Sequence, residues 1–290
     1  MDVAGSEPGS GPTVLRILLG SQLRELREAK GVSRDDAGYA IRSSGSKISR
    51  MELGRVSFKE RDVADLLTLY GVTGTQERAA LLTLVVEANA PGWWHRYGDV
   101  LPTWFQSYVG LEAAASMIRT YELQFVPGLL QSEEYARAVI MLGHAGVPTA
   151  ELSRRVELRM TRQHVLTRPH PVRLWAVVDE AALRRPIGGA DVMRGQLEHL
   201  MTMTKLPHVT LQVIPFQAGG HAASGGAFSI LRFPDQQLPD VVYTEQLTSA
   251  LYLDRREDVD SYLEAMERLC VDADPPSRTH DILDEILNEM

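Results

Sequence analysis

The chain has 290 residues, of which 44% are hydrophobic and 23% are charged, and its formal net charge is −8. These values are typical of a soluble globular protein of about two domains, and no apolar run approaches the ~20 residues that a membrane helix requires. The single cysteine, Cys270, excludes an internal disulfide and a multi-cysteine metal site. We therefore expect a cytoplasmic protein with no metal, no cofactor and no membrane partner.

The N-terminal segment, residues 1–12, is rich in Gly, Ser and Pro and has neither the basic start nor the apolar stretch of a signal peptide. Its composition predicts a disordered tail. A first helix is expected over 14–30, because leucines recur there at helical spacing from Leu15 to Leu26. Gly31 is a suitable stop for this helix.

Residues 31–55, GVSRDDAGYAIRSSGSKISRMELGR, have the spacing of a helix-turn-helix. Ser33 is expected to cap a short helix, with Asp36 three residues later in an approximate capping box. A polar turn follows, and Ser44 is expected to cap a second helix over 45–52. The apolar side chains expected to face inward are Ala37, Ala40, Ile41, Ile48 and Met51.

The outer face of the second helix is where we expect DNA to be read. Ser46 and Arg50 lie four residues apart on this face, and an arginine there can donate two hydrogen bonds to guanine in the major groove. Arg34 and Arg55, on either side of the helix, are placed for phosphates. Glu52 is expected to be structural and to pair with a cation of the first helix. The residues predicted to contact DNA are Arg34, Ser44, Gly45, Ser46, Lys47, Ser49, Arg50 and Arg55.

Charge is distributed unevenly along the chain. Residues 13–71 contain 11 Lys or Arg against 8 Asp or Glu, so the remainder carries the whole negative excess. A basic segment on an acidic protein favours a DNA-binding head joined to a body that phosphate repels. The alternative, a solvated charged face on an ordinary pair of helices, explains the cations but not the ordered caps, turn and apolar spacing.

Two further helices are expected over 60–70 and 76–88, which completes an all-α N-terminal helix-turn-helix domain of about five helices over 13–90. The next segment, 91–110, contains three of the four tryptophans and is expected to be an aromatic-rich connector. Its rings either fill a core between domains or line a ligand pocket.

The region 111–275 is expected to form an α+β C-terminal domain with a largely antiparallel sheet, for regulation or interaction. Helical periodicity covers 111–120, 132–142, 150–166, 191–204 and 254–271. Alternation with a period of two predicts strands over 172–179, 208–214, 227–233, 240–245 and 250–253. We expect 276–290 to be a C-terminal tail.

Two segments of the C-terminal domain have some features of ligand sites. The glycine-rich stretch 218–228 lacks the Lys-Ser/Thr ending of a phosphate-binding loop and precedes a strand, so we expect a hairpin connection with His221 exposed to solvent. At 179–185, two carboxylates and two arginines form either a polar binding site or a salt-bridged helix start. No recognisable nucleophile and base arrangement is present, so we do not expect an enzyme.

At the helix-turn-helix the chain resembles the XRE-type family. The small residue within the family's first helix is met by Ala37 and Gly38, and its run I-S-R-x-E-x-G-R is met from Ile48 to Arg55. The glycine usual in the turn is Arg42 here. This departure leaves the turn geometry and the start of the recognition helix open.

Longer phrases are similar to the actinomycete WhiJ-like regulators, and the similarity spans about Leu15 to Leu269. They include GWWHRYGDVLPTWFQSYVGLE, VPGLLQSEEYARAV and VVYTEQLTSALYLD. The resemblance implies a transcriptional regulator with an XRE-type head and a C-terminal domain without established chemistry. It also implies a small acidic partner protein encoded nearby.

The sequence thus predicts a sequence-specific transcriptional regulator that binds double-stranded DNA. We expect a homodimer, since one short recognition helix reads only a few base pairs. The C-terminal domain would serve for dimerisation and for sensing a ligand or a small partner protein. The alternative is an antitoxin-like interaction module whose main role is to bind a small partner protein, with DNA binding as autoregulation.

Overall fold

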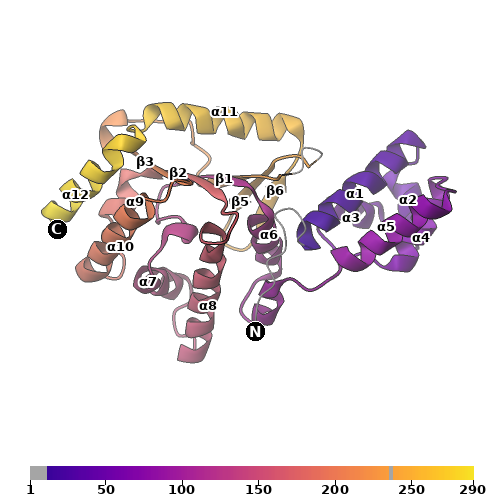
Figure 1. The fold of residues 1–290 in the computed structure, drawn as a ribbon, viewed down its shortest axis with the longest axis horizontal. Coiled ribbons are helices and arrows are strands. Elements are labelled where there is room, and N and C mark those ends of the chain that lie inside the picture. The colour runs from indigo at the N-terminus through magenta and orange to yellow at the C-terminus, as the bar shows by residue number, and fades with distance from the viewer. Residues whose placement is uncertain (1–11, 235–237) are drawn as a thin grey trace. The chain divides into compact units, whose positions relative to one another are not determined.

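A computed structural model describes residues 12–234 and 238–290 of the chain, so most of the predicted N-terminal tail lies outside the described residues. The chain divides into two compact units (Figure 1). Within the described residues, the first unit comprises 12–96, 106–114, 234 and 238, and the second comprises 97–105, 115–233 and 239–290. None of the described helices is long and apolar enough to cross a membrane.

Five helices form most of the first unit, as the sequence predicts. They are α1 (Pro12–Ala29), α2 (Arg34–Ala40), α3 (Gly45–Glu52), α4 (Glu60–Leu69) and α5 (Thr75–Ala88). Their apolar faces meet in one core, in which Leu19, Leu23, Ile48, Met51 and Leu66 are almost fully buried. The regularly spaced leucines of α1 therefore face the core, as their spacing predicts. Burying one apolar face of each short helix stabilises all five helices together.

One inward-facing prediction for α2 is wrong. Ala37 and Ile41 are buried as expected, whereas Ala40 is exposed and Gly38 is buried in its place. The reason is that α3 begins directly against residue 38, which turns that side of the seven-residue helix inward.

The remaining helices follow in chain order. They are η1 (Trp93–Tyr97), α6 (Thr103–Ala114), η2 (Gly128–Leu130), α7 (Glu133–Gly143), α8 (Thr149–Arg162), η3 (Gln163–Leu166), α9 (Glu180–Arg184), α10 (Ala190–Met203), η4 (Phe216–Ala218), α11 (Arg256–Asp272), η5 (Pro276–Arg278) and α12 (Thr279–Glu289). The strands are β1 (Met117–Glu122), β2 (Arg173–Asp179), β3 (Val209–Ile214), β4 (Phe228–Arg232), β5 (Val241–Glu245) and β6 (Ala250–Leu253).

The strands form one mixed sheet in the order β3-β2-β1-β4-β5-β6. The α+β class is confirmed, and the pairings β4–β5 and β5–β6 are antiparallel as expected. Strand β1, which was not predicted, also pairs antiparallel with β4. The pairings β1–β2 and β2–β3 are parallel, which the sequence prediction missed. Parallel neighbours need a long crossover, and the helices between these strands supply it.

Strand β1 lies where a helix was expected over 111–120, so that prediction is wrong in its second half. Helix α6 ends at Ala114, and Met117 begins the strand. The apolar run continues across this boundary without Gly or Pro, so local periodicity has no signal for the change. Pairing with β2 on one side and β4 on the other decides it.

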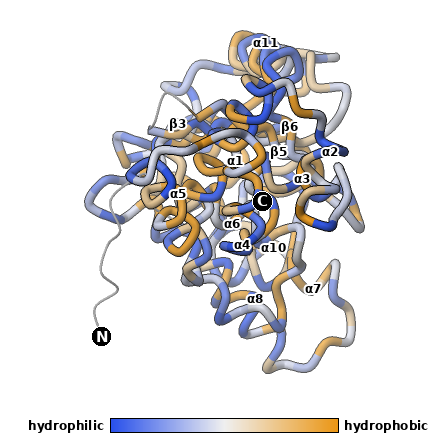
Figure 2. Tube along the Cα trace, turned by 90° about the vertical axis from the view of Figure 1, so that its right-hand side faces the viewer, coloured by the Kyte–Doolittle hydropathy of each residue, from blue (hydrophilic) through white to orange (hydrophobic). Residues whose placement is uncertain are grey.

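Helices cover both faces of the sheet (Figure 1). Tyr121, Val177 and Val242 lie in one cluster with Met266 and Leu269 of α11, which covers that face. In Figure 2, hydrophilic and hydrophobic stretches alternate along α11, as expected for an amphipathic helix with one buried side. Helices α7, α8 and α10 lie on the other side of the sheet (Figure 1).

The end of the chain is a structured element and not the tail that we expected over 276–290. Helix α12 buries Leu283 and Ile286 and contacts α10. Thr279 at its start donates a hydrogen bond to the backbone oxygen of Leu211 in β3. The apolar pattern of a single short terminal helix is a weak signal, and in this protein tertiary contacts stabilise the helix.

The aromatic segment 91–110 contains η1 and most of α6. Trp94 and Tyr97 are buried, and the Tyr97 hydroxyl donates a 2.8 Å hydrogen bond to Glu157 of α8. Both observations favour packing as the role of these two rings.

Candidate nucleic-acid interface

The caps of α2 and α3 form where the sequence predicts them. Ser33 Oγ accepts a hydrogen bond from the Asp36 backbone N–H at 3.1 Å and donates one to the Asp36 carboxylate at 2.7 Å. Ser44 Oγ accepts from the Lys47 N–H at 3.3 Å. Each cap satisfies a backbone donor at a helix start, so both short helices begin at defined residues.

Two glycines allow the helices around α3 to approach closely. A Cβ on Gly38 of α2 would lie 2.6 Å from the Ser44 carbonyl carbon, and one on Gly20 of α1 would lie 2.5 Å from the Met51 carbonyl oxygen. No Cβ tolerates these distances to backbone atoms. Both positions therefore require glycine for α3 to sit where it does.

The turn between α2 and α3 contains a left-handed residue. Arg42 has φ 55°, and it is the one described non-glycine residue with positive φ. Its N–H donates to Tyr39 O at 3.0 Å, and the Ser43 N–H donates to Gly38 O at 2.8 Å. Arg42 thus adopts the conformation for which glycine is the usual residue. The substitution leaves the turn and the start of α3 intact.

The buried and exposed faces of α3 divide in part as predicted: the two inward residues and two of the four outward ones lie where the sequence placed them. Ile48 and Met51 are each 1% exposed, whereas Ser46 and Arg50 face solvent. Of the other residues predicted to contact DNA, Arg34, Ser44 and Arg55 are exposed, and Gly45, Lys47 and Ser49 are partly buried.

A buried carboxylate joins three helices behind this face. Glu52, at the end of α3, accepts hydrogen bonds from Arg27 of α1 at 2.5 Å and from Arg34 of α2 at 3.1 Å. This confirms the expected pairing of Glu52 with the first helix. The bond to Glu52 raises the pKa of Arg27, and burial, with Glu52 nearby, raises the pKa of Tyr70 to about 12. Arg27 and Tyr70 therefore keep their protons.

A second ion pair ties α3 to α4. Lys47 Nζ lies 2.6 Å from Oδ2 of Asp62, a side chain that is 3% exposed. Arg34 and Lys47 were both predicted to contact DNA, and both hold buried carboxylates. The Arg34 side chain is still 44% exposed and that of Lys47 is 26% exposed. Spacing alone could not reveal these partners, because they come from distant parts of the chain.

Comparisons with family models agree with this arrangement. Residues 18–81 match a model described as a helix-turn-helix domain. Residues 105–285 match one described as a domain of unknown function, DUF5753, and this match covers more than half of the chain. The chain belongs to the DUF5753 family. No curated protein and no solved structure matches it.

In this DUF5753 protein the helix-turn-helix domain indicates DNA binding. Sequence analysis missed one exposed residue beside the interface. Tyr39, near the end of α2, is 86% exposed. The sequence feature that could have identified Tyr39 is an aromatic residue that lies off the apolar stripe of a short helix, two positions after Ala37. An exposed tyrosine next to the turn can hydrogen-bond a phosphate.

The polar segment 179–185 of the DUF5753 domain is a salt-bridged helix start. Glu180 accepts a 2.5 Å hydrogen bond from Arg184 and a 2.8 Å bond from the Phe216 backbone N–H. Asp179 accepts from the Ala181 N–H and so caps α9. Of the two alternatives for this segment, the structural one fits these contacts.

His221, expected to be exposed to solvent, is instead partly buried. Its side chain is 17% exposed, and Nε2 lies 2.9 Å from the Tyr121 hydroxyl. Nδ1 accepts a hydrogen bond from the Ala223 N–H. These contacts pin the glycine-rich stretch to β1, which a reading of the stretch by itself does not predict.

Proposed function

We propose that this protein is a sequence-specific transcriptional regulator that reads double-stranded DNA with α3 in the major groove. The main support is the pair Ser46 and Arg50, which is exposed on a helix whose other face is buried against the core. A guanidinium in this position can form the two hydrogen bonds that distinguish guanine. The serine hydroxyl beside it can donate to or accept from a base edge.

Exposed cations on both sides of α3 would set its register on the duplex. Arg34 precedes it on α2, Arg42 lies in the turn, and Arg55 follows it. Contacts of arginine with phosphate carry no sequence information, but they orient the recognition helix. The positive excess of residues 13–71, within a chain of net charge −8, supports binding through this face.

The proposal includes an XRE-type mode of binding and a homodimer. Helix α3 has eight residues, so one copy reads only a short half-site. Two copies related by a two-fold axis would read a palindrome and reach the affinity that a specific regulator needs. The dimer is tested by sedimentation of the full chain with and without its operator, and a strictly monomeric protein in both conditions contradicts it.

Selection from a random DNA library tests the regulator itself. The full chain should enrich a short palindromic motif. The Arg50→Ala variant should bind that motif ~1–3 kcal/mol more weakly and lose the preference for one base pair of each half-site. Arg256→Ala is the matched control, because it removes the same charge from a side chain that is 93% exposed in the other unit. A motif that is absent, or one that survives Arg50→Ala unchanged, contradicts the proposal.

A further inference from the structure

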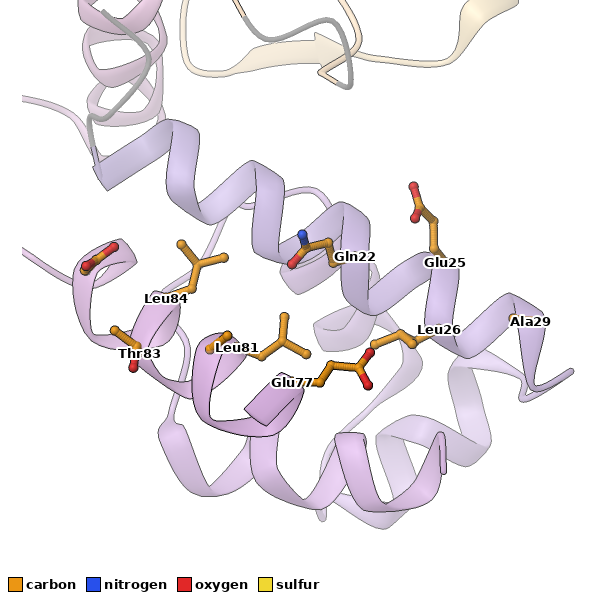
Figure 3. Close-up of a pocket in the computed structure, with 10 residues that line it drawn as sticks. Gln22, Glu25, Leu26, Ala29, Glu77, Leu81, Thr83 and Leu84 are labelled. Atoms are coloured by element: carbon orange, nitrogen blue, oxygen red, sulfur yellow. The ribbon is translucent and has the colours of Figure 1, made fainter. Parts of the chain in front are cut away.

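A groove runs between α1 and α5 of the first unit and has a volume of about 760 Å³ (Figure 3). Its apolar side chains include Leu26 of α1 and Leu81 and Leu84 of α5. In Figure 3 these leucines extend into the space between the two helices. Leu26 and Leu84 are only partly buried although they pack against the core, so the groove presents apolar surface to solvent.

The polar residues of the groove are strongly biased in charge. Glu25, Glu77 and Glu87 line it, and no lysine or arginine is among its lining residues. All three carboxylates are exposed. Throughout the part of the chain that the structure describes, none of the three forms an ion pair. The groove is therefore an apolar strip with an unneutralised acidic margin.

The groove lies on the opposite side of α1 from the recognition helix. Gly20 marks the side that touches α3. At 100° per residue, Gln22, Glu25 and Ala29 lie roughly 140–200° around α1 from Gly20. A molecule bound in the groove would leave the outer face of α3 open to DNA.

The dimensions suit a short helix. From Glu77 to Glu87 the groove follows α5 for ten residues, or about 15 Å at the helical rise. About three turns of a docked helix cover that length. An amphipathic helix in such a groove places its apolar stripe on the leucines and its flanking side chains on the margin.

We propose that this groove binds a basic amphipathic helix of a partner protein. Lys or Arg side chains flanking its apolar stripe would meet Glu25 on one margin and Glu77 and Glu87 on the other. A second copy of this chain fits poorly, because a two-fold contact across the groove would bring two identical acidic margins together. The inference does not depend on whether α3 reads DNA.

Selection from a displayed library of helical peptides of about 14 residues tests the proposal on the full chain. The library carries leucine at every third or fourth position and a free choice of Lys, Arg, Glu, Gln or Ala at the flanking positions. We expect enriched peptides to have Lys or Arg on both flanks. Enrichment of neutral or acidic flanks, or no enrichment, overturns the proposal.

Two variants then locate the binding site of an enriched peptide. Glu25→Gln combined with Glu77→Gln and Glu87→Gln should weaken binding about 10-fold, because three favourable charges are lost. Ala80→Arg adds a bulky cation to an exposed position in the groove and should abolish binding. Circular dichroism and thermal melting check that both variants fold.

The matched control changes the net charge equally at three exposed carboxylates outside the groove: Asp65→Asn, Glu264→Gln and Glu267→Gln. It should alter peptide affinity less than about 2-fold. An equal loss in the control shows attraction to the net charge alone and overturns the proposal. A second outcome also overturns the proposal: the chain self-associates, and it dissociates when the three groove glutamates are replaced. A second copy of the chain then occupies the groove.

Discussion

The Lys47 ammonium of the recognition helix lies 2.6 Å from the Asp62 carboxylate of α4. Asp62 is 3% exposed and Lys47 is its nearer cation, with Arg61 farther away at 3.6 Å. A cation next to the DNA-reading face is thus held by the protein core. Base reading then falls mainly to the exposed Ser46 and Arg50.

We expect Lys47→Gln to reduce the free energy of unfolding of the first unit by about 1–3 kcal/mol, because Asp62 loses its main counter-charge. The salt dependence of DNA binding should change little. A lysine that contacts phosphate would instead lower the slope of log affinity against log salt by about 0.9. Urea denaturation and binding at several salt concentrations measure both effects, and a lower slope with unchanged stability contradicts the structural role.

Replacement of Glu52, the other buried carboxylate, should lower the free energy of unfolding by a larger amount. In Glu52→Gln the buried Arg27 loses its charged partner, and we expect a loss of about 3 kcal/mol in unfolding free energy. Glu28→Gln is the control, since Glu28 also lies 3.2 Å from Arg27 but is 52% exposed. It should cost less than about 1 kcal/mol. Similar losses in the two variants, measured by urea denaturation, would show that burial does not set the strength of these pairs.

The turn offers a stabilising substitution. Arg42→Gly removes the ~1–2 kcal/mol cost of a left-handed side-chain-bearing residue. Part of this gain, ~0.4–1 kcal/mol, is offset by the greater freedom of glycine in the unfolded chain. We expect a slightly higher melting temperature and weaker DNA binding, since a cation beside the duplex is lost. A clear drop in melting temperature would mean that the Arg42 side chain stabilises the turn.

Gly38→Ala should have the opposite effect on stability. The added Cβ would lie 2.6 Å from the Ser44 carbonyl carbon, so α2 and α3 must move apart. We expect a loss of about 1–3 kcal/mol together with weaker DNA binding. Gly195→Ala on α10 is the control, because its Cβ meets nothing within 4 Å. There the better helix propensity of alanine should leave stability unchanged or raise it by up to ~1 kcal/mol.

The second unit should respond to pH through Glu122 at the end of β1. Burial raises its pKa to about 7, against the opposing effect of Arg159 and with the help of Glu245. A folded-state pKa above that of the unfolded chain stabilises the unit fully at acidic pH, and this contribution is lost as the pH rises through about 7. Glu122→Gln, which mimics the neutral acid, should therefore raise the melting temperature at about pH 8 and change it little at about pH 5.

Thermal melting across this range measures the effect, with Glu264→Gln as the exposed control. A gain for Glu122→Gln that is the same at both ends of the range would show that the carboxyl does not titrate there.

Local chemistry determined much of the first unit. The bounds of α3, its Ser44 cap and the inward placement of Ile48 and Met51 all followed from the sequence. Caps and helical periodicity act within one or two turns, so neighbouring residues are sufficient to predict them.

The amino-acid sequence was sufficient to predict the helix-turn-helix, most element positions and the α+β class of the second unit. Tertiary structure alone decided that 117–122 is a strand, that β1, β2 and β3 run parallel, and that His221 is held by Tyr121. It also decided that Arg34 and Lys47 bind carboxylates on other helices. Strand pairing and buried ion pairs join residues far apart in the chain, and no short-range pattern specifies which distant partner each residue meets.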